Sequence, residues 1–116
     1  MEHRLSKRIP GRVSLLVFKR GMPVATGLVQ DASRRGVFVA TDYDDVKLNQ
    51  TVELELYYPD RTMESLRRLK AHVVRKSEQG IGLDFDMVEN DALCIAHLLQ
   101  WLQQHPKAQR HYSPMH

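Results

Sequence analysis

The feature of this sequence that most limits its fold is a series of short runs with β-strand character, each followed by turn-forming residues. The runs cover residues 12–18, 24–30, 36–41, 51–58, 69–76 and 81–85. The fourth run is the clearest, because Val52, Leu54 and Leu56 alternate with polar or charged side chains. Such alternation is typical of a strand that buries one face and exposes the other. Short connections rich in Gly, Pro, Asp and Ser favour antiparallel neighbours.

Six short strands with one apolar face each need a second sheet or closure into a barrel, because an open antiparallel sheet leaves unpaired edges. We therefore expect a mostly β fold, a six-stranded antiparallel β-barrel over residues 12–87. After the barrel the apolar residues follow a helical period, which predicts a C-terminal α-helix over residues 88–105. Asn90 or Asp91 is expected to cap this helix, and Pro106 to end it.

Length and composition indicate one folded domain. A chain of 116 residues is near the usual size of a domain with one core, and 42% hydrophobic and 27% charged residues exclude a wholly disordered chain. We expect residues 1–11 to form a mobile arm and residues 106–116 a frayed tail. No run approaches the roughly 18 apolar residues that span a membrane, and the start lacks the apolar core of a secretion signal. A cytoplasmic location without membrane insertion is expected.

Positive charge is concentrated in the first third of the chain. Residues 1–36 carry eight basic and two acidic side chains, residues 37–116 carry nine basic and twelve acidic ones, and the whole chain has a net charge of +3. Such a field attracts phosphate groups. A solvated basic surface that binds nothing is the plain alternative, and charge alone does not decide between the two.

The sequence contains no recognisable arrangement for catalysis or for metal binding. Its six histidines form no His-x-x-x-His pair, and Cys94 and His97, one helical turn apart, are too few ligands for a zinc site. Ser33 lacks the Gly-x-Ser-x-Gly setting of a nucleophilic serine. We therefore expect a protein that is not an enzyme, with no catalytic residue, no metal and no cofactor.

Two short motifs carry the clearest functional signal. Residues 4–8 read Arg-Leu-Ser-Lys-Arg before the first strand, and residues 31–36 read Asp-Ala-Ser-Arg-Arg-Gly between the second and the third. In their order, and in the 22 residues between Arg8 and Asp31, they resemble the Arg-x-x-x-Arg and Asp/Asn-x-Ser-x-x-Gly signatures of the PilZ family. Residues 80–85 are similar to the closing strand of such domains. The resemblance covers essentially the whole chain, because a six-stranded barrel followed by a C-terminal helix is the architecture of that family.

The resemblance implies a receptor for the bacterial second messenger cyclic di-GMP. The binding residues would be Arg4, Arg8, Asp31, Ser33 and Gly36. An arginine fork can grip a phosphate or the O6 and N7 atoms of guanine, which suits Arg4 and Arg8. Asp31 can accept the N1 and N2 protons of guanine. Ser33 can donate to a phosphate or bond its own loop, and Gly36 permits a positive φ or a close backbone approach.

Ligand capture is expected to order the arm at residues 1–11 against the barrel and to present an altered surface to a downstream protein partner. Arg34 and Arg35 either assist at the ligand or are solvated loop charges. Two other functions remain open. A basic barrel that binds nucleic acid is disfavoured by the scarcity of aromatic residues, three Phe, four Tyr and one Trp, so no nucleic acid is expected as a partner. A structural adaptor without a ligand is disfavoured because both motifs are intact.

Overall fold

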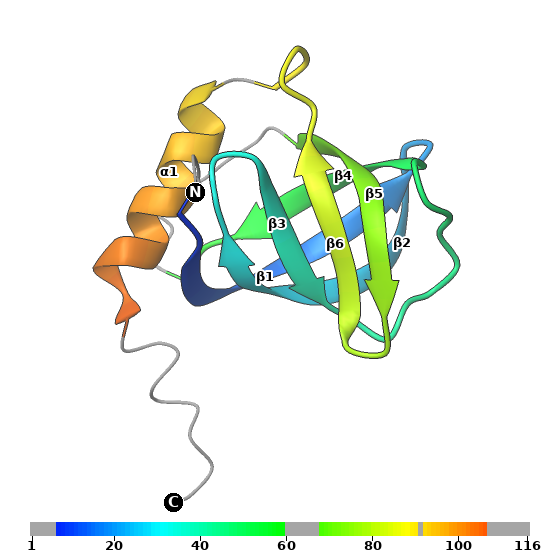
Figure 1. The fold of residues 1–116 in the computed structure, drawn as a ribbon, viewed down its shortest axis with the longest axis horizontal. Helices are drawn as coiled ribbons and strands as arrows, with labels where there is room; N and C mark the ends of the chain where they lie inside the picture. Colours follow the sequence, from blue (N-terminus) through cyan, green and yellow to red (C-terminus); the bar gives the residue numbers. More distant parts are fainter. Residues whose placement is uncertain (1–6, 60–67, 91, 107–116) are drawn as a thin grey trace, which may run out of the picture.

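The computed structural model describes residues 7–59, 68–90 and 92–106, which form a closed antiparallel barrel with one helix (Figure 1). The elements in chain order are β1 (Ile9–Lys19), β2 (Met22–Ala32), β3 (Gly36–Ala40), β4 (Thr51–Tyr57), β5 (Leu69–Ser77), β6 (Gly80–Phe85) and α1 (Ala92–Gln104). Around the barrel the strands follow the order β1-β2-β3-β6-β5-β4, and β4 pairs back onto β1. The six-stranded antiparallel barrel with a C-terminal helix, predicted from the sequence, is confirmed.

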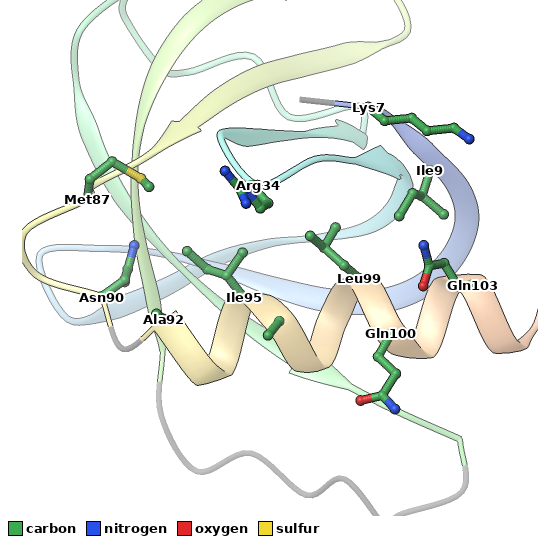
Figure 2. A pocket seen from close by; sticks show the side chains of 11 residues that line it. Lys7, Ile9, Arg34, Met87, Asn90, Ala92, Ile95, Leu99, Gln100 and Gln103 are labelled. Atoms are coloured by element: carbon green, nitrogen blue, oxygen red, sulfur yellow. The ribbon is translucent and has the colours of Figure 1, made fainter. Parts of the chain in front are cut away.

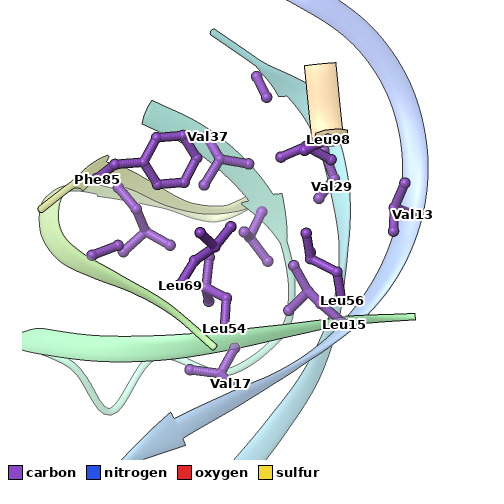
Figure 3. Packing of buried hydrophobic residues seen from close by; sticks show 14 of the residues in the cluster. Val13, Leu15, Val17, Val29, Val37, Leu54, Leu56, Leu69, Phe85 and Leu98 are labelled. Carbon is purple, nitrogen blue, oxygen red and sulfur yellow. The ribbon is translucent and has the colours of Figure 1, made fainter. Parts of the chain in front are cut away.

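The barrel interior is filled by the apolar positions of the alternating strands (Figure 3). Val52, Leu54 and Leu56 of β4 are at most 6% exposed. The β1–β4 register sets Leu15 opposite Leu56, so the inward side chains of the two strands pack together. Burial of each such side chain contributes about 1.5–3 kcal/mol. The interior core therefore holds the strands in one register and fixes which side chains face outward.

Helix α1 packs against one end of the barrel (Figure 1). Leu98 and Leu102 are 0% and 1% exposed, and Leu98 lies among the barrel residues in Figure 3. The approach is close because β1 carries Gly11 at the contact, where a Cβ would lie 2.4 Å from Cδ2 of Leu102. Trp101 is buried beside Tyr58, with ring centroids 5.8 Å apart, and burial raises the pKa of Tyr58 to about 12. No helix in the described ranges is long and apolar enough to cross a membrane.

The first strand is longer than the sequence indicated. β1 begins at Ile9, so the last part of the expected arm at residues 1–11 belongs to the barrel. Pro10 pairs with Asp31 at the end of β2. This extension brings the segment that precedes β1 directly beside the loop between β2 and β3.

The helix is shorter than the predicted span of residues 88–105, because it begins at Ala92. A turn occupies the preceding positions, where the carboxylate of Asp86 accepts the backbone amides three and two residues ahead, each at 2.9 Å. These bonds hold the pKa of Asp86 below its ordinary value. Asn90, one of the two expected caps, bonds the backbone of Lys70 through both its carbonyl oxygen and its amide nitrogen, each at 2.8 Å. The turn is thereby tied to β5.

Candidate ligand-binding site

An ion pair links the segment before β1 to the end of β2. Nε of Arg8 donates to Oδ1 of Asp31 at 2.6 Å, and a terminal guanidinium nitrogen lies 2.5 Å from the same oxygen. The pairing of Pro10 with Asp31 produces this contact, because it carries the residue before the strand to the carboxylate. The two side chains remain 49% and 35% exposed, so a ligand can reach both. Exposed ion pairs of this kind add little to stability.

Ser33 and Gly36 shape the turn between β2 and β3. The amide of Ser33 donates to the carbonyl of Gly36 at 2.8 Å, and Oγ of Ser33 accepts the amide of Arg35 at 3.1 Å. Ser33 is only 1% exposed, so its hydroxyl bonds its own loop. Gly36 has no positive φ; it permits a close approach, because a Cβ there would lie 2.2 Å from the carbonyl oxygen of Leu83 in β6.

The ion pair stands at one end of a row of residues that crosses the outer face of the barrel. In successive strands, Asp31 pairs with Phe38, Phe38 pairs with Gly82, and Gly82 pairs with Arg75. Residues directly opposite each other in neighbouring strands share one face of the sheet. Phe38 faces outward because the residues on either side of it are buried in the core. The guanidinium of Arg75 lies over the ring of Phe38, 5.4 Å from its centroid.

A cleft of about 320 Å³ follows this row. Arg8, Phe38 and Arg75 line it, together with the carboxylate of Asp84. Gly82 also lines the cleft and keeps it open, since it has no side chain to fill the space between its neighbours. Two guanidinium groups and an aromatic ring therefore border one concave surface. Guanidinium groups bind phosphates and stack on planar rings, so this surface suits a ligand that has both.

Phe38 and Arg75 were not predicted as site residues. The outward position of Phe38 was visible in the sequence, because it stands between two valines in a short strand. The position of Arg75 was not, because it depends on an irregularity between Val73 and Arg75 that shifts the β5–β6 register.

Most of the predicted site lies in the described part of the chain: Arg8, Asp31, Ser33 and Gly36. The structure brings Arg8 and Asp31 into contact and puts the other two in the adjoining turn. Arg34 and Arg35 are exposed on that same turn. Arg4 lies outside the described residues, as does the alternative helix cap Asp91.

Comparison with known proteins adds one finding. The family model of the PilZ domain matches residues 2–104, a span that contains both motifs, the six strands and all of α1. Among curated proteins, no sequence matches the chain.

Proposed function

Since this chain belongs to the PilZ family, we propose that it is a receptor for cyclic di-GMP that acts in the cytoplasm and carries out no reaction. The dinucleotide binds on the outer face of the barrel, at the end of β2 and along the adjoining cleft. Binding changes the surface that the protein offers to a downstream partner protein. The predicted site residues keep their roles in this proposal, with the buried Ser33 and Gly36 acting through the shape of the turn.

The observation that carries the proposal is the exposed ion pair between Arg8 and Asp31. Guanine offers its N1 and N2 protons to a carboxylate, and it offers O6 and N7 to an arginine fork. The phosphates offer Arg8 a second kind of charge-assisted partner. Both side chains are already partly exposed. Each can therefore leave its partner and bind the ligand without uncovering a buried charge.

The cleft beside the ion pair supports a second part of the interaction. A guanine ring can stack on Phe38 or on the guanidinium of Arg75, and base stacking on such groups is worth about 1–3 kcal/mol per base. Arg4 supplies a further guanidinium to the ligand in this proposal. Arg4 and Arg8 bind the ligand and thereby fix the chain before β1 against the barrel. The partner protein detects this change.

Calorimetric titration tests the proposal. Cyclic di-GMP should bind with a micromolar or tighter Kd, about −8 kcal/mol or more favourable, whereas GTP and cyclic di-AMP should bind more weakly. Absence of binding would leave the chain as a structural adaptor on the same fold. A single-stranded oligonucleotide that bound more tightly than cyclic di-GMP at about 0.15 M salt would favour a nucleic-acid-binding barrel instead.

A further inference from the structure

A groove of about 820 Å³ runs along one face of α1, beside the contact between the helix and the barrel. In Figure 2, Ile95 and Leu99 point from the helix into the groove. Met87 stands near one end of the groove and Ile9 near the other. The groove is thus an apolar channel that follows one face of the helix.

The charged residues that line this groove have one sign. Lys7 and Arg34 line it, both exposed, and the remaining polar lining residues are neutral amides. None of the lining residues, all of which lie in the described ranges, is acidic. Positive surfaces attract complementary negative partners and orient them on approach. An occupant that is apolar on one side and carries carboxylates beside that side matches the groove.

Large apolar side chains are also exposed in the segment that leads into α1 and in the first turn of the helix. Met87 is 66% exposed, and Val88 and Leu93, next to the start of α1, are 89% and 67% exposed. Large exposed apolar side chains that gather in one region mark interaction surfaces. Methionine is suited to such a surface, because its unbranched side chain adapts to different partners.

We propose that this groove docks an acidic, amphipathic helix of a partner protein and that cyclic di-GMP controls the docking. The groove follows α1 from Ala92 to Gln103, a distance of about 16 Å at 1.5 Å per residue, which matches about three turns of a second helix. Ala92 and Ala96 let such a helix approach closely. Amphipathic helices that lie in apolar grooves are a recurrent mode of recognition.

Control by the ligand rests on the proposed function. The groove and the ligand site share chain segments, because Lys7 directly precedes Arg8 and because Arg34 belongs to the turn that follows Asp31. When a ligand replaces the contact between Arg8 and Asp31, Lys7 moves with its neighbour Arg8, whereas Arg34 stays on its turn and changes the charge it faces. Such a coupling is reciprocal, so the docked helix must change the affinity for cyclic di-GMP by the same factor.

A phage-displayed library of random 16-residue peptides, selected on the full chain with and without cyclic di-GMP, tests the chemistry of the occupant. The expected peptides have apolar residues at helical spacing with Asp or Glu beside them. Their affinity should fall as salt rises, because exposed charges are screened. Failure to enrich any peptide, or enrichment of basic peptides, would overturn the proposal.

Two matched variants locate the binding. Ala96→Glu puts a carboxylate and extra bulk into the groove, whereas His97→Glu adds the same side chain at the next, exposed helix position, which does not line the groove. The selected peptide should bind Ala96→Glu at least about tenfold more weakly than the unmodified chain and should bind His97→Glu almost unchanged. Equal binding to both variants, each shown to be folded, would overturn the assignment of the groove.

Titration of the same peptide with cyclic di-GMP present tests whether the ligand controls docking. A shift of about fivefold or more in peptide affinity, matched by an equal shift in cyclic di-GMP affinity, supports it. If cyclic di-GMP binds and the peptide affinity stays constant, the control by ligand is wrong while the receptor function stands. If cyclic di-GMP does not bind at all, the receptor function and the control both fail, and the peptide data alone decide the docking site.

Other occupants are distinguishable in the same preparations. A dimer that forms with rising concentration and is abolished by Ala96→Glu would assign the groove to a second copy of this chain. Contacts from residues 1–6 to Leu99 in a nuclear Overhauser spectrum would assign it to the chain itself. Binding to phosphatidylglycerol vesicles, abolished by Ala96→Glu and accompanied by no peptide enrichment, would assign it to a membrane. Each of these results would overturn the proposed partner helix.

Discussion

Asp31 and Ser33 are two residues apart in one motif, yet their side chains have opposite surroundings. Asp31 is 35% exposed and bonds the side chain of Arg8, whereas Ser33 is 1% exposed and bonds the backbone of its own turn. The candidate site therefore contains two regions. We call Arg8 and Asp31 the exchangeable pair, and residues 33–36 the fixed turn.

The two regions differ in the free energy that each loses when a ligand replaces its internal contacts. A buried polar group that loses its hydrogen-bond partner costs about 1–3 kcal/mol, so the fixed turn cannot give up its bonds to a ligand. An exposed ion pair contributes only about 0–1 kcal/mol to stability, so the exchangeable pair can give up its contact to a ligand. Substitutions in the fixed turn should therefore reduce stability, and substitutions in the exchangeable pair should reduce affinity.

The largest effect is expected in the fixed turn. Gly36→Val should destabilise the fold by about 3 kcal/mol, because its Cβ would meet the carbonyl oxygen of Leu83, a backbone atom that cannot move aside. Urea unfolding, followed by circular dichroism, measures the change. Gly82→Ala is the control, since a Cβ there lies 3.4 Å from its nearest neighbour, an ordinary contact. Equal unfolding midpoints for Gly36→Val and the unmodified chain would show that the close approach of Gly36 to β6 does not contribute to stability.

In the exchangeable pair, Arg8→Ala should weaken cyclic di-GMP binding roughly tenfold to more than a hundredfold, since a charge-assisted contact contributes about 1.5–3 kcal/mol. Its unfolding midpoint should stay close to that of the unmodified chain, because the ion pair is exposed. Titration calorimetry and urea unfolding on the same sample give both values. Arg20→Gln removes one positive charge after the opposite end of β1 and should leave the affinity nearly unchanged. A comparable loss in both variants would indicate that overall charge, and not Arg8, binds the ligand.

Ser33→Ala should have a smaller effect, about 1 kcal/mol on stability, because it removes the acceptor of the Arg35 amide. The remaining folded protein should bind cyclic di-GMP with little change if the hydroxyl acts only within the turn. Thermal unfolding together with calorimetry separates the two effects. A tenfold or larger loss of affinity without loss of stability would move Ser33 from the fixed turn to the group of residues that contact the ligand.

The smallest effect concerns Asp86, a carboxylate whose partners are fixed. The amides of Glu89 and Val88 lower its pKa below 3.8, with a smaller contribution from His72. A lowered pKa stabilises the fold above the ordinary value, and this stability is lost as the pH falls through the folded pKa. Asp86→Asn should therefore flatten the decline of the melting temperature below about pH 4, whereas Asp44→Asn, at an exposed loop position, should not. Identical pH profiles for the two variants would contradict this role.

Much of the fold was predictable because alternation and turn chemistry are local properties. The ends of the elements were not. Pro10 and Gly11 are poor strand residues, so the sequence predicts that the strand starts after them; the structure accommodates both beside an irregularity in the β1–β2 ladder. The helix start shifted because Asp86 bonds the amides of the turn before α1 and because Asn90 bonds the backbone of Lys70 in β5, a partner that only the folded chain brings near.

The candidate site was predictable where it depends on residue type and spacing, as for Arg8 and Asp31. The part of the site that depends on strand register was harder to predict. The row that joins Asp31 to Arg75 crosses four strands, and no pattern within one strand reveals which residues its neighbours set beside it. The burial that separates the fixed turn from the exchangeable pair is likewise a tertiary property.

The proposed recognition of guanine is tested most directly by asking whether Asp31 contacts the base. The measurement is the ratio of the Kd for cyclic di-AMP to the Kd for cyclic di-GMP, in the unmodified chain and in folded Asp31→Ala. Adenine has no N1 or N2 proton to donate, so the substitution should weaken cyclic di-GMP binding roughly tenfold or more and leave the weaker cyclic di-AMP binding almost unchanged. The ratio should therefore fall roughly tenfold or more in Asp31→Ala. Equal fractional losses for both dinucleotides would contradict this expectation and would show that Asp31 shapes the loop without contacting the base.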